Sequence, residues 1–183
     1  MKKSTAMLIG TVTYIVFFLY LLLVIKVLLF KFGPIEFKAL FSYMSSSLSS
    51  PELIRERLLT HGNLIPFHEI RNYLANLIIG GSTISNVNFI GNIIAFLPFG
   101  FLLPFLQQQK NRSFVKVTFL SFLFSLCLET TQLLASIGTF DVDDLLLNTA
   151  GGMLGYIGYK LCRLFFTHRP QKRKSIAVQE RTV

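Results

Sequence analysis

Charged residues are scarce in this chain, and acidic residues are the scarcest. Asp, Glu, Lys and Arg make up 15% of the 183 residues, and only nine are acidic against 18 that are basic. Hydrophobic residues make up 52% of the chain, and its mean hydropathy is +0.56. Soluble domains carry about 25% charged residues. The composition therefore excludes an ordinary soluble domain and predicts an integral membrane protein.

Cysteine and signal-peptide features are also lacking. We expect Cys127 and Cys162 in opposite halves of the membrane, too far apart for the Cα separation of about 5.5 Å that a disulfide requires. The apolar run at residues 7–30 follows a basic start but precedes no A-x-A-like cleavage site. An uncleaved N-terminal anchor is therefore predicted in place of a signal peptide.

Four apolar stretches are long enough to cross a membrane, which takes about 20 residues. They cover residues 7–30, 87–106, 114–135 and 145–166. We therefore predict an all-α membrane protein with a four-helix transmembrane bundle and an extracytoplasmic amphipathic helical segment between the first two spans. The predicted parts are an N-terminal anchor at 1–30, the extracytoplasmic segment at 31–86, a three-span core at 87–166 and a basic cytoplasmic tail at 167–183.

The basic residues predict the orientation of the bundle. With a cytoplasmic N-terminus, twelve of the 18 basic residues lie at the inner side and seven of the nine acidic residues lie outside. Basic residues are enriched in cytoplasmic loops, so both termini are predicted to be cytoplasmic. Membrane topology thus explains the net charge of +9, and the tail is expected to meet anionic lipid headgroups. No nucleic-acid partner is predicted.

The extracytoplasmic segment combines a predicted connector with two predicted helices. The serine-rich stretch at 42–50 suggests a flexible connector. Ser50 and Pro51 are typical of an N-cap and a first helical position. Residues 63–80 show apolar positions at helical spacing, which predicts a helix lying on the outer membrane surface, with a re-entrant segment as the alternative.

Amide and carboxylate side chains interrupt the apolar spans at matching depths. With a rise of 1.5 Å per residue, those within the spans lie within about 10 Å of the outer ends, and the acidic loop lies just above them. Such groups are costly in a membrane, so they are candidate functional residues. We predict an outward-facing polar pocket whose ligand-binding residues are Asn88, Asn92, Glu129, Gln132, Asp141, Asp144 and Asn148.

The same residues leave three interpretations open. Glu129, Asp141 and Asp144 are oxygen ligands suited to a hard divalent cation, but they lack a recognised ligand spacing, and no cofactor is predicted. No Ser, Cys or His at this depth has a partner base, so Glu129 would be the acid or base if the protein were an enzyme. The third interpretation is a structural network that only fixes helix packing.

Small residues in the last span predict a close helix contact. Gly151 and Gly155 form a G-x-x-x-G pair, which lets another helix approach its backbone. The partner is either another span of the same chain or a second copy in a homo-oligomer.

Several of these motifs resemble the VanZ-like membrane proteins. The resemblance runs from about residue 63 to 159 and rests on NLIPF at 63–67, NFIGNIIAFLPFGFLLP at 88–104, the E-x-x-Q of Glu129 and Gln132, and DVDDLLLNTAGGMLGY at 141–156. The family often has an arginine before the acidic motif, where this chain has Gly138, Thr139 and Phe140.

The resemblance implies a multi-pass protein of the bacterial cell membrane linked with reduced sensitivity to teicoplanin-like glycopeptide antibiotics. It implies no established reaction. The predicted pocket would then bind a membrane lipid, a lipid-linked wall precursor or the antibiotic. A membrane enzyme acting on an envelope lipid and a purely structural polar network are the alternatives.

Overall fold

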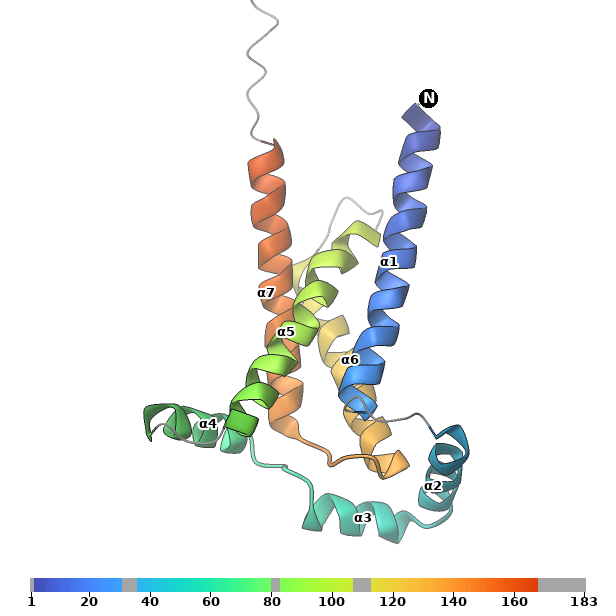
Figure 1. The fold of residues 1–183 in the computed structure, drawn as a ribbon, viewed down its shortest axis with the longest axis vertical. Coiled ribbons are helices and arrows are strands. Elements are labelled where there is room, and N and C mark those ends of the chain that lie inside the picture. The colour runs from blue at the N-terminus through green and yellow to red at the C-terminus, as the bar shows by residue number, and fades with distance from the viewer. Residues whose placement is uncertain (1, 31–35, 80–82, 107–112, 168–183) are drawn as a thin grey trace, which may run out of the picture.

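Four long helices form an elongated shaft, and three shorter helices form a wider base at one end of it (Figure 1). The computed structural model describes residues 2–30, 36–79, 83–106 and 113–167. Within these ranges the chain is helical with short connections. The shaft consists of α1 (Lys2–Phe30), α5 (Thr83–Leu106), α6 (Phe114–Ala135) and α7 (Val142–Thr167), and the base of α2 (Phe37–Ser49), α3 (Pro51–Thr60) and α4 (His68–Ile79).

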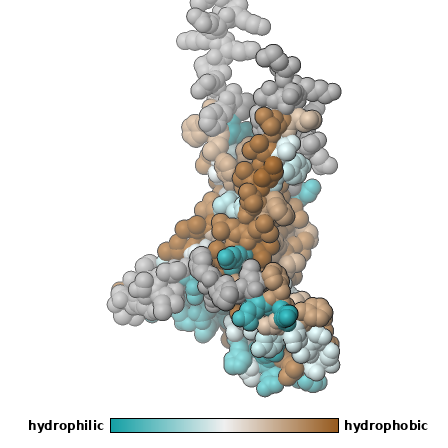
Figure 2. Space-filling view, turned by 45° about the vertical axis from the view of Figure 1, so that its right-hand side comes forward, coloured by the Kyte–Doolittle hydropathy of each residue, from teal (hydrophilic) through white to brown (hydrophobic). Residues whose placement is uncertain are grey.

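Three of the described helices are long and apolar enough to cross a membrane. These stretches are Gly10–Phe30 in α1, Asn88–Leu106 in α5 and Phe114–Ala135 in α6, and apolar residues cover the shaft in Figure 2. Helix α7 has 26 residues, about 39 Å, but its glycines, Asn148 and Lys160 lower its hydropathy. The all-α membrane prediction is thus confirmed with three candidate spans, while the fourth span stays a prediction.

The chain's helical part begins and ends at the same end of the shaft. Helix α1 begins, and helix α7 ends, at the end of the shaft opposite the base (Figure 1). A chain that crosses a membrane an even number of times has both of its ends on the same side. Residues 107–112, which include the basic Lys110 and Arg112, and the tail from residue 168 lie outside the described residues.

Helices α5 and α7 make the most extensive contact in the fold. A Cβ added to Gly155 would overlap the Leu97 carbonyl oxygen, and one added to Gly151 would overlap that of Ile93. The G-x-x-x-G pair therefore faces α5 of the same chain. A homo-oligomer through Gly151 and Gly155 stays a prediction, and it would have to displace α5 from these glycines.

The base is more helical than the sequence suggests. The serine-rich stretch expected to be a flexible connector is mostly part of α2, and its Ser47 is fully buried with its Oγ donating to the Leu134 carbonyl oxygen at 2.8 Å. Helix α3 begins with Pro51 as expected, although the Ser50 side chain makes no capping hydrogen bond. Contact with the end of α6 thus stabilises a helix that its own composition does not favour.

Candidate functional site: a carboxylate and amide network at the base

The loop between α6 and α7 folds back onto the end of α6. Ser136 ends that helix in the left-handed conformation, at φ 56°, and the Ile137 N–H donates to the Gln132 carbonyl oxygen. The loop then turns so that the Asp141 N–H donates to Glu129 Oε2 at 2.9 Å. Glu129, which is 3% exposed, therefore holds the acidic motif against α6.

Asp141 joins this loop to the segment that precedes α4. Its Oδ1 accepts from the Asp143 N–H at 2.7 Å, as an N-cap of α7 does, and from Asn63 Nδ2 at 2.8 Å. The backbones also pair, since the Asn63 N–H donates to Phe140 O and the Val142 N–H donates to Asn63 O, both at 2.9 Å. Two segments 78 residues apart in the sequence are thus fixed side by side.

Asp143 is the most deeply buried acid of the motif, with no exposed surface. Its Oδ1 accepts from the Phe67 N–H at 2.5 Å, and its Oδ2 accepts from the N–H groups of Glu69 and Ile70 at 2.6 and 3.1 Å. These donors lie at the start of α4, where unpaired N–H groups and the helix dipole favour an anion. Phe67 has a φ of 67°, so the chain takes an uncommon conformation at this contact.

Three amide side chains extend the network into the shaft. Asn92 Nδ2 on α5 donates to Asp144 Oδ1 on α7. Asn148 Nδ2 on α7 donates to Ser125 Oγ on α6 at 2.8 Å, and Gln132 Nε2 on α6 donates to the Leu28 carbonyl oxygen of α1 at 2.9 Å. The network therefore contacts all four helices of the shaft.

Burial affects the pKa of the Asp141 carboxylate. Desolvation raises the pKa of Asp141 above its usual value, and the nearby Asp143 carboxylate adds to this, although hydrogen bonds from the Asp143 N–H and Asn63 act in the opposite direction. Folding thus disfavours the charged form of Asp141 relative to the unfolded chain.

The structure brings most of the predicted site residues together. Asn92, Gln132 and Asn148 are at most 8% exposed and hydrogen-bonded as described, whereas Asn88 is exposed and apart from these contacts. The prediction omitted Asp143 and Asn63, although both lie in the motifs that carry the family resemblance. It also omitted Ser125, whose Oγ accepts from Asn148 Nδ2. A helical spacing of four from Ser125 to Glu129 would have placed both on one face.

The network's arrangement shows which of its atoms already have partners. Backbone N–H groups and amides occupy oxygens of Glu129, Asp141 and Asp143. In the part of the chain that the structure describes, no group of three or more His, Cys, Asp or Glu residues is placed to hold a metal ion. An open pocket of about 390 Å³ lies elsewhere, on the apolar side of α6, lined by Phe114, Val115, Thr118, Phe119, Phe122 and Thr149.

Comparison with known proteins identifies the family. A family model described as VanZ/LLP1 matches residues 17–163. The chain belongs to this family. It is also similar to "Protein VanZ" of Enterococcus faecium, with 31% identity over 160 residues that cover 85% of this chain and 76% of that protein. No solved structure matches the chain.

Family membership confirms the resemblance inferred from the motifs. The VanZ-like motifs supply Asn63, Asn92, Glu129 and the three aspartates, which are the residues that the network joins. Segments that are separate in the sequence thus form one hydrogen-bonded unit at the base of the shaft.

Proposed function

We propose that this VanZ-like protein crosses the bacterial cell membrane four times and lowers sensitivity to teicoplanin-like glycopeptide antibiotics. The family match over residues 17–163, which includes about half of α1 and nearly all of the core, carries this proposal. In the proposed orientation, the base and its acidic motif face outward and both termini are cytoplasmic. The shared position of the ends of α1 and α7 supports this topology.

We expect deletion of the gene to lower the minimal inhibitory concentration of teicoplanin more than that of vancomycin, which lacks a fatty acyl chain. Restoring the wild-type gene should restore the teicoplanin value, and broth dilution measures both. An unchanged teicoplanin value in the deletion strain would contradict the proposed role. An equal decrease for both drugs would indicate a general weakening of the envelope.

The network marks the proposed outer-leaflet site for a membrane lipid, a lipid-linked wall precursor or the antibiotic. Its carboxylate and amide groups lie at the outward end of a membrane-crossing bundle, where such amphiphiles present their polar parts. The alternative, an enzyme with Glu129 as acid or base, has weaker support because Glu129 Oε2 accepts the buried Asp141 N–H. That bond favours a role for Glu129 in positioning the loop.

We expect Glu129→Gln to be tolerated and Glu129→Ala to be destabilising. The amide oxygen of Gln can still accept the Asp141 N–H, whereas Ala leaves that donor unsatisfied, at a cost of about 1–3 kcal/mol. Membrane abundance and thermal unfolding in detergent measure the difference. A Glu129→Gln protein of normal abundance and stability that no longer supports antibiotic tolerance would instead favour acid or base chemistry.

A further inference from the structure

Helix α2 carries an apolar face that the rest of the described structure leaves uncovered. Phe37, Phe41 and Leu48 are 72%, 77% and 66% exposed. Their spacings of four and seven residues place them on one side of the helix. We call these three residues the α2 apolar face. Large aromatic side chains exposed together indicate a surface that contacts something apolar.

The orientation of this face is fixed by contacts on another side of the helix. Ser47 Oγ donates to the Leu134 carbonyl oxygen, and Arg57 Nη1 on α3 donates to Ser47 Oγ at 2.9 Å. Arg57 also reaches the Leu133 carbonyl oxygen, so its cation lies at the C-terminal end of α6, where the helix dipole favours positive charge. Ser47 is about a quarter-turn away from the apolar face. These bonds therefore hold the apolar face away from α6.

The side of α2 away from this face is mostly polar. Lys38, Ser42 and Ser46 follow one another at spacings of four, and all three are exposed. The helix thus carries apolar and polar residues on different sides, which is the pattern of a helix lying at a membrane surface. A helix in contact with water alone is not expected to expose two phenylalanines on one side.

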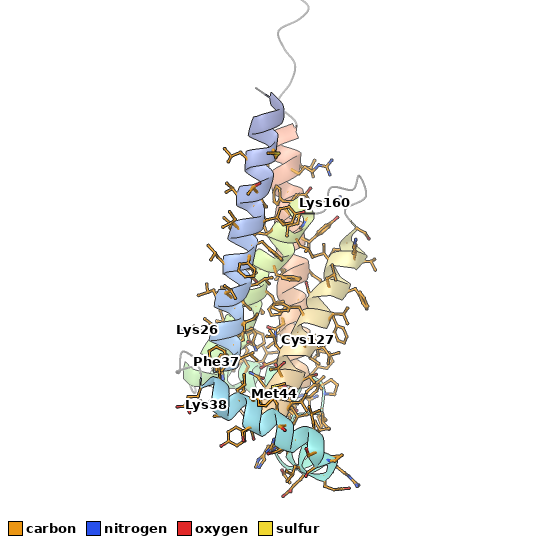
Figure 3. The ribbon with its side chains drawn as sticks, turned by 90° about the vertical axis from the view of Figure 1, so that its right-hand side faces the viewer. Lys26, Phe37, Lys38, Met44, Cys127 and Lys160 are labelled. Carbon is orange, nitrogen blue, oxygen red and sulfur yellow. The ribbon has the colours of Figure 1, made fainter. Side chains whose placement is uncertain are left out.

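The position of α2 in the fold indicates what covers the apolar face. In Figure 3, Phe37 and Lys38 at the start of α2 and Lys26 near the end of α1 lie at a similar level along the shaft, where the apolar shaft meets the base. Leu22 and Leu23, one turn before Lys26, are 49% and 60% exposed on the membrane-crossing helix. The start of α2 therefore lies near the level at which the exposed apolar surface of α1 ends, with one lysine on each helix.

We propose that the α2 apolar face inserts into the outer leaflet, with Phe37 and Phe41 below the lipid headgroups and Lys26 and Lys38 beside the phosphates of anionic phospholipids. Aromatic side chains and lysines of this kind are enriched at membrane interfaces. The serines remain in water, and α3, which is the more polar neighbour, lies farther out. This contact extends beyond the proposed antibiotic role and does not depend on it.

Spin labels on the full chain test this contact. The two native cysteines are replaced, as Cys127→Ser and Cys162→Ser, and single cysteines are introduced by Phe37→Cys, Phe41→Cys or Ser46→Cys. Ser46 is exposed and lies on the side of α2 away from the apolar face. The labelled proteins are reconstituted in vesicles of equal parts phosphatidylcholine and phosphatidylglycerol. Labels at 37 and 41 should be relaxed more by oxygen, which partitions into lipid, and the label at 46 more by a water-soluble nickel complex.

Two results would overturn the proposal. Labels at 37 and 41 that respond to nickel like the label at 46 would place the face in water. Protection of both labels from oxygen and nickel would show that protein covers the face, either a second copy or another partner. Two positions are used so that misfolding of one variant still leaves the other as a test. In vesicles of phosphatidylcholine alone, the label at 41 should lie shallower, and equal depth would exclude the role of the lysines.

Discussion

Replacing Asp143 by Asn should destabilise the protein strongly, although the two side chains have nearly the same shape. Both carboxylate oxygens of Asp143 accept backbone N–H groups, Oδ1 from Phe67 and Oδ2 from Glu69 and Ile70. Asn offers one oxygen, so its NH2 group would face at least one buried N–H donor. We expect a loss of about 2–4 kcal/mol in the free energy of unfolding, measured by denaturant titration in mixed micelles.

Asp141→Asn is the matched control, because the bonds that its side chain accepts from Asn63 Nδ2 and the Asp143 N–H both end on one oxygen, Oδ1. An amide oxygen can accept both, and Asn caps helices as well as Asp does. The raised pKa of Asp141 means that its contribution to stability falls as the pH rises from the unfolded value through the folded one. The substitution keeps these bonds and the helix cap, and we expect a change within about 1 kcal/mol near neutral pH.

The two aspartate variants together distinguish a specific hydrogen-bonding role of Asp143 from a general requirement for acidic residues in the motif. Equal and large losses for both would indicate that the charge of the motif matters more than its hydrogen bonds. Equal and small losses would show that the start of α4 does not depend on Asp143. Protection of the amides of Glu69 and Ile70 against hydrogen exchange should decrease in Asp143→Asn and persist in Asp141→Asn.

Hydropathy and helical spacing predicted the shaft and much of the network. The depths of Asn92, Glu129 and Asn148 follow from the rise of a helix, so their common level was accessible from the sequence. The hydrogen-bond partners did not follow from this common depth. The structure pairs Asn92 with Asp144 and Asn148 with Ser125. Rotation of one helix about its axis decides between such partners, and hydropathy does not determine that rotation.

The base could not be predicted in the same way, because distant segments stabilise it. Helix α2 includes most of a serine-rich stretch. Its buried Ser47 is hydrogen-bonded to Leu134 and Arg57, which lie 87 and 10 residues away in the sequence. The start of α4 depends on Asp143, more than 70 residues away. Local propensity misses helices that depend on such contacts. The apolar face of α2 could not be predicted for the same reason, because it exists only if this stretch forms a helix.

Gly155→Ala and Gly158→Ala should have opposite effects on stability, although both put a methyl group into the same helix. Ala is favoured over Gly in a helix by up to about 1 kcal/mol, and this gain applies equally to both. A Cβ on Gly155 overlaps the Leu97 backbone, so α5 would have to move, and overpacking of this kind costs about 1–3 kcal/mol or more. The nearest neighbour of a Cβ on Gly158 is a Phe101 side-chain carbon at an ordinary 3.8 Å.

Thermal unfolding in detergent and the elution volume on size exclusion separate two roles for Gly155. If its face packs on α5 of the same chain, Gly155→Ala lowers the unfolding temperature and leaves the oligomeric state unchanged, while Gly158→Ala keeps or raises that temperature. If the face instead joins two copies, Gly155→Ala changes the oligomeric state of a protomer that stays folded. Full stability of Gly155→Ala with no change in elution would contradict the α5–α7 contact itself, because the methyl group has no room in it.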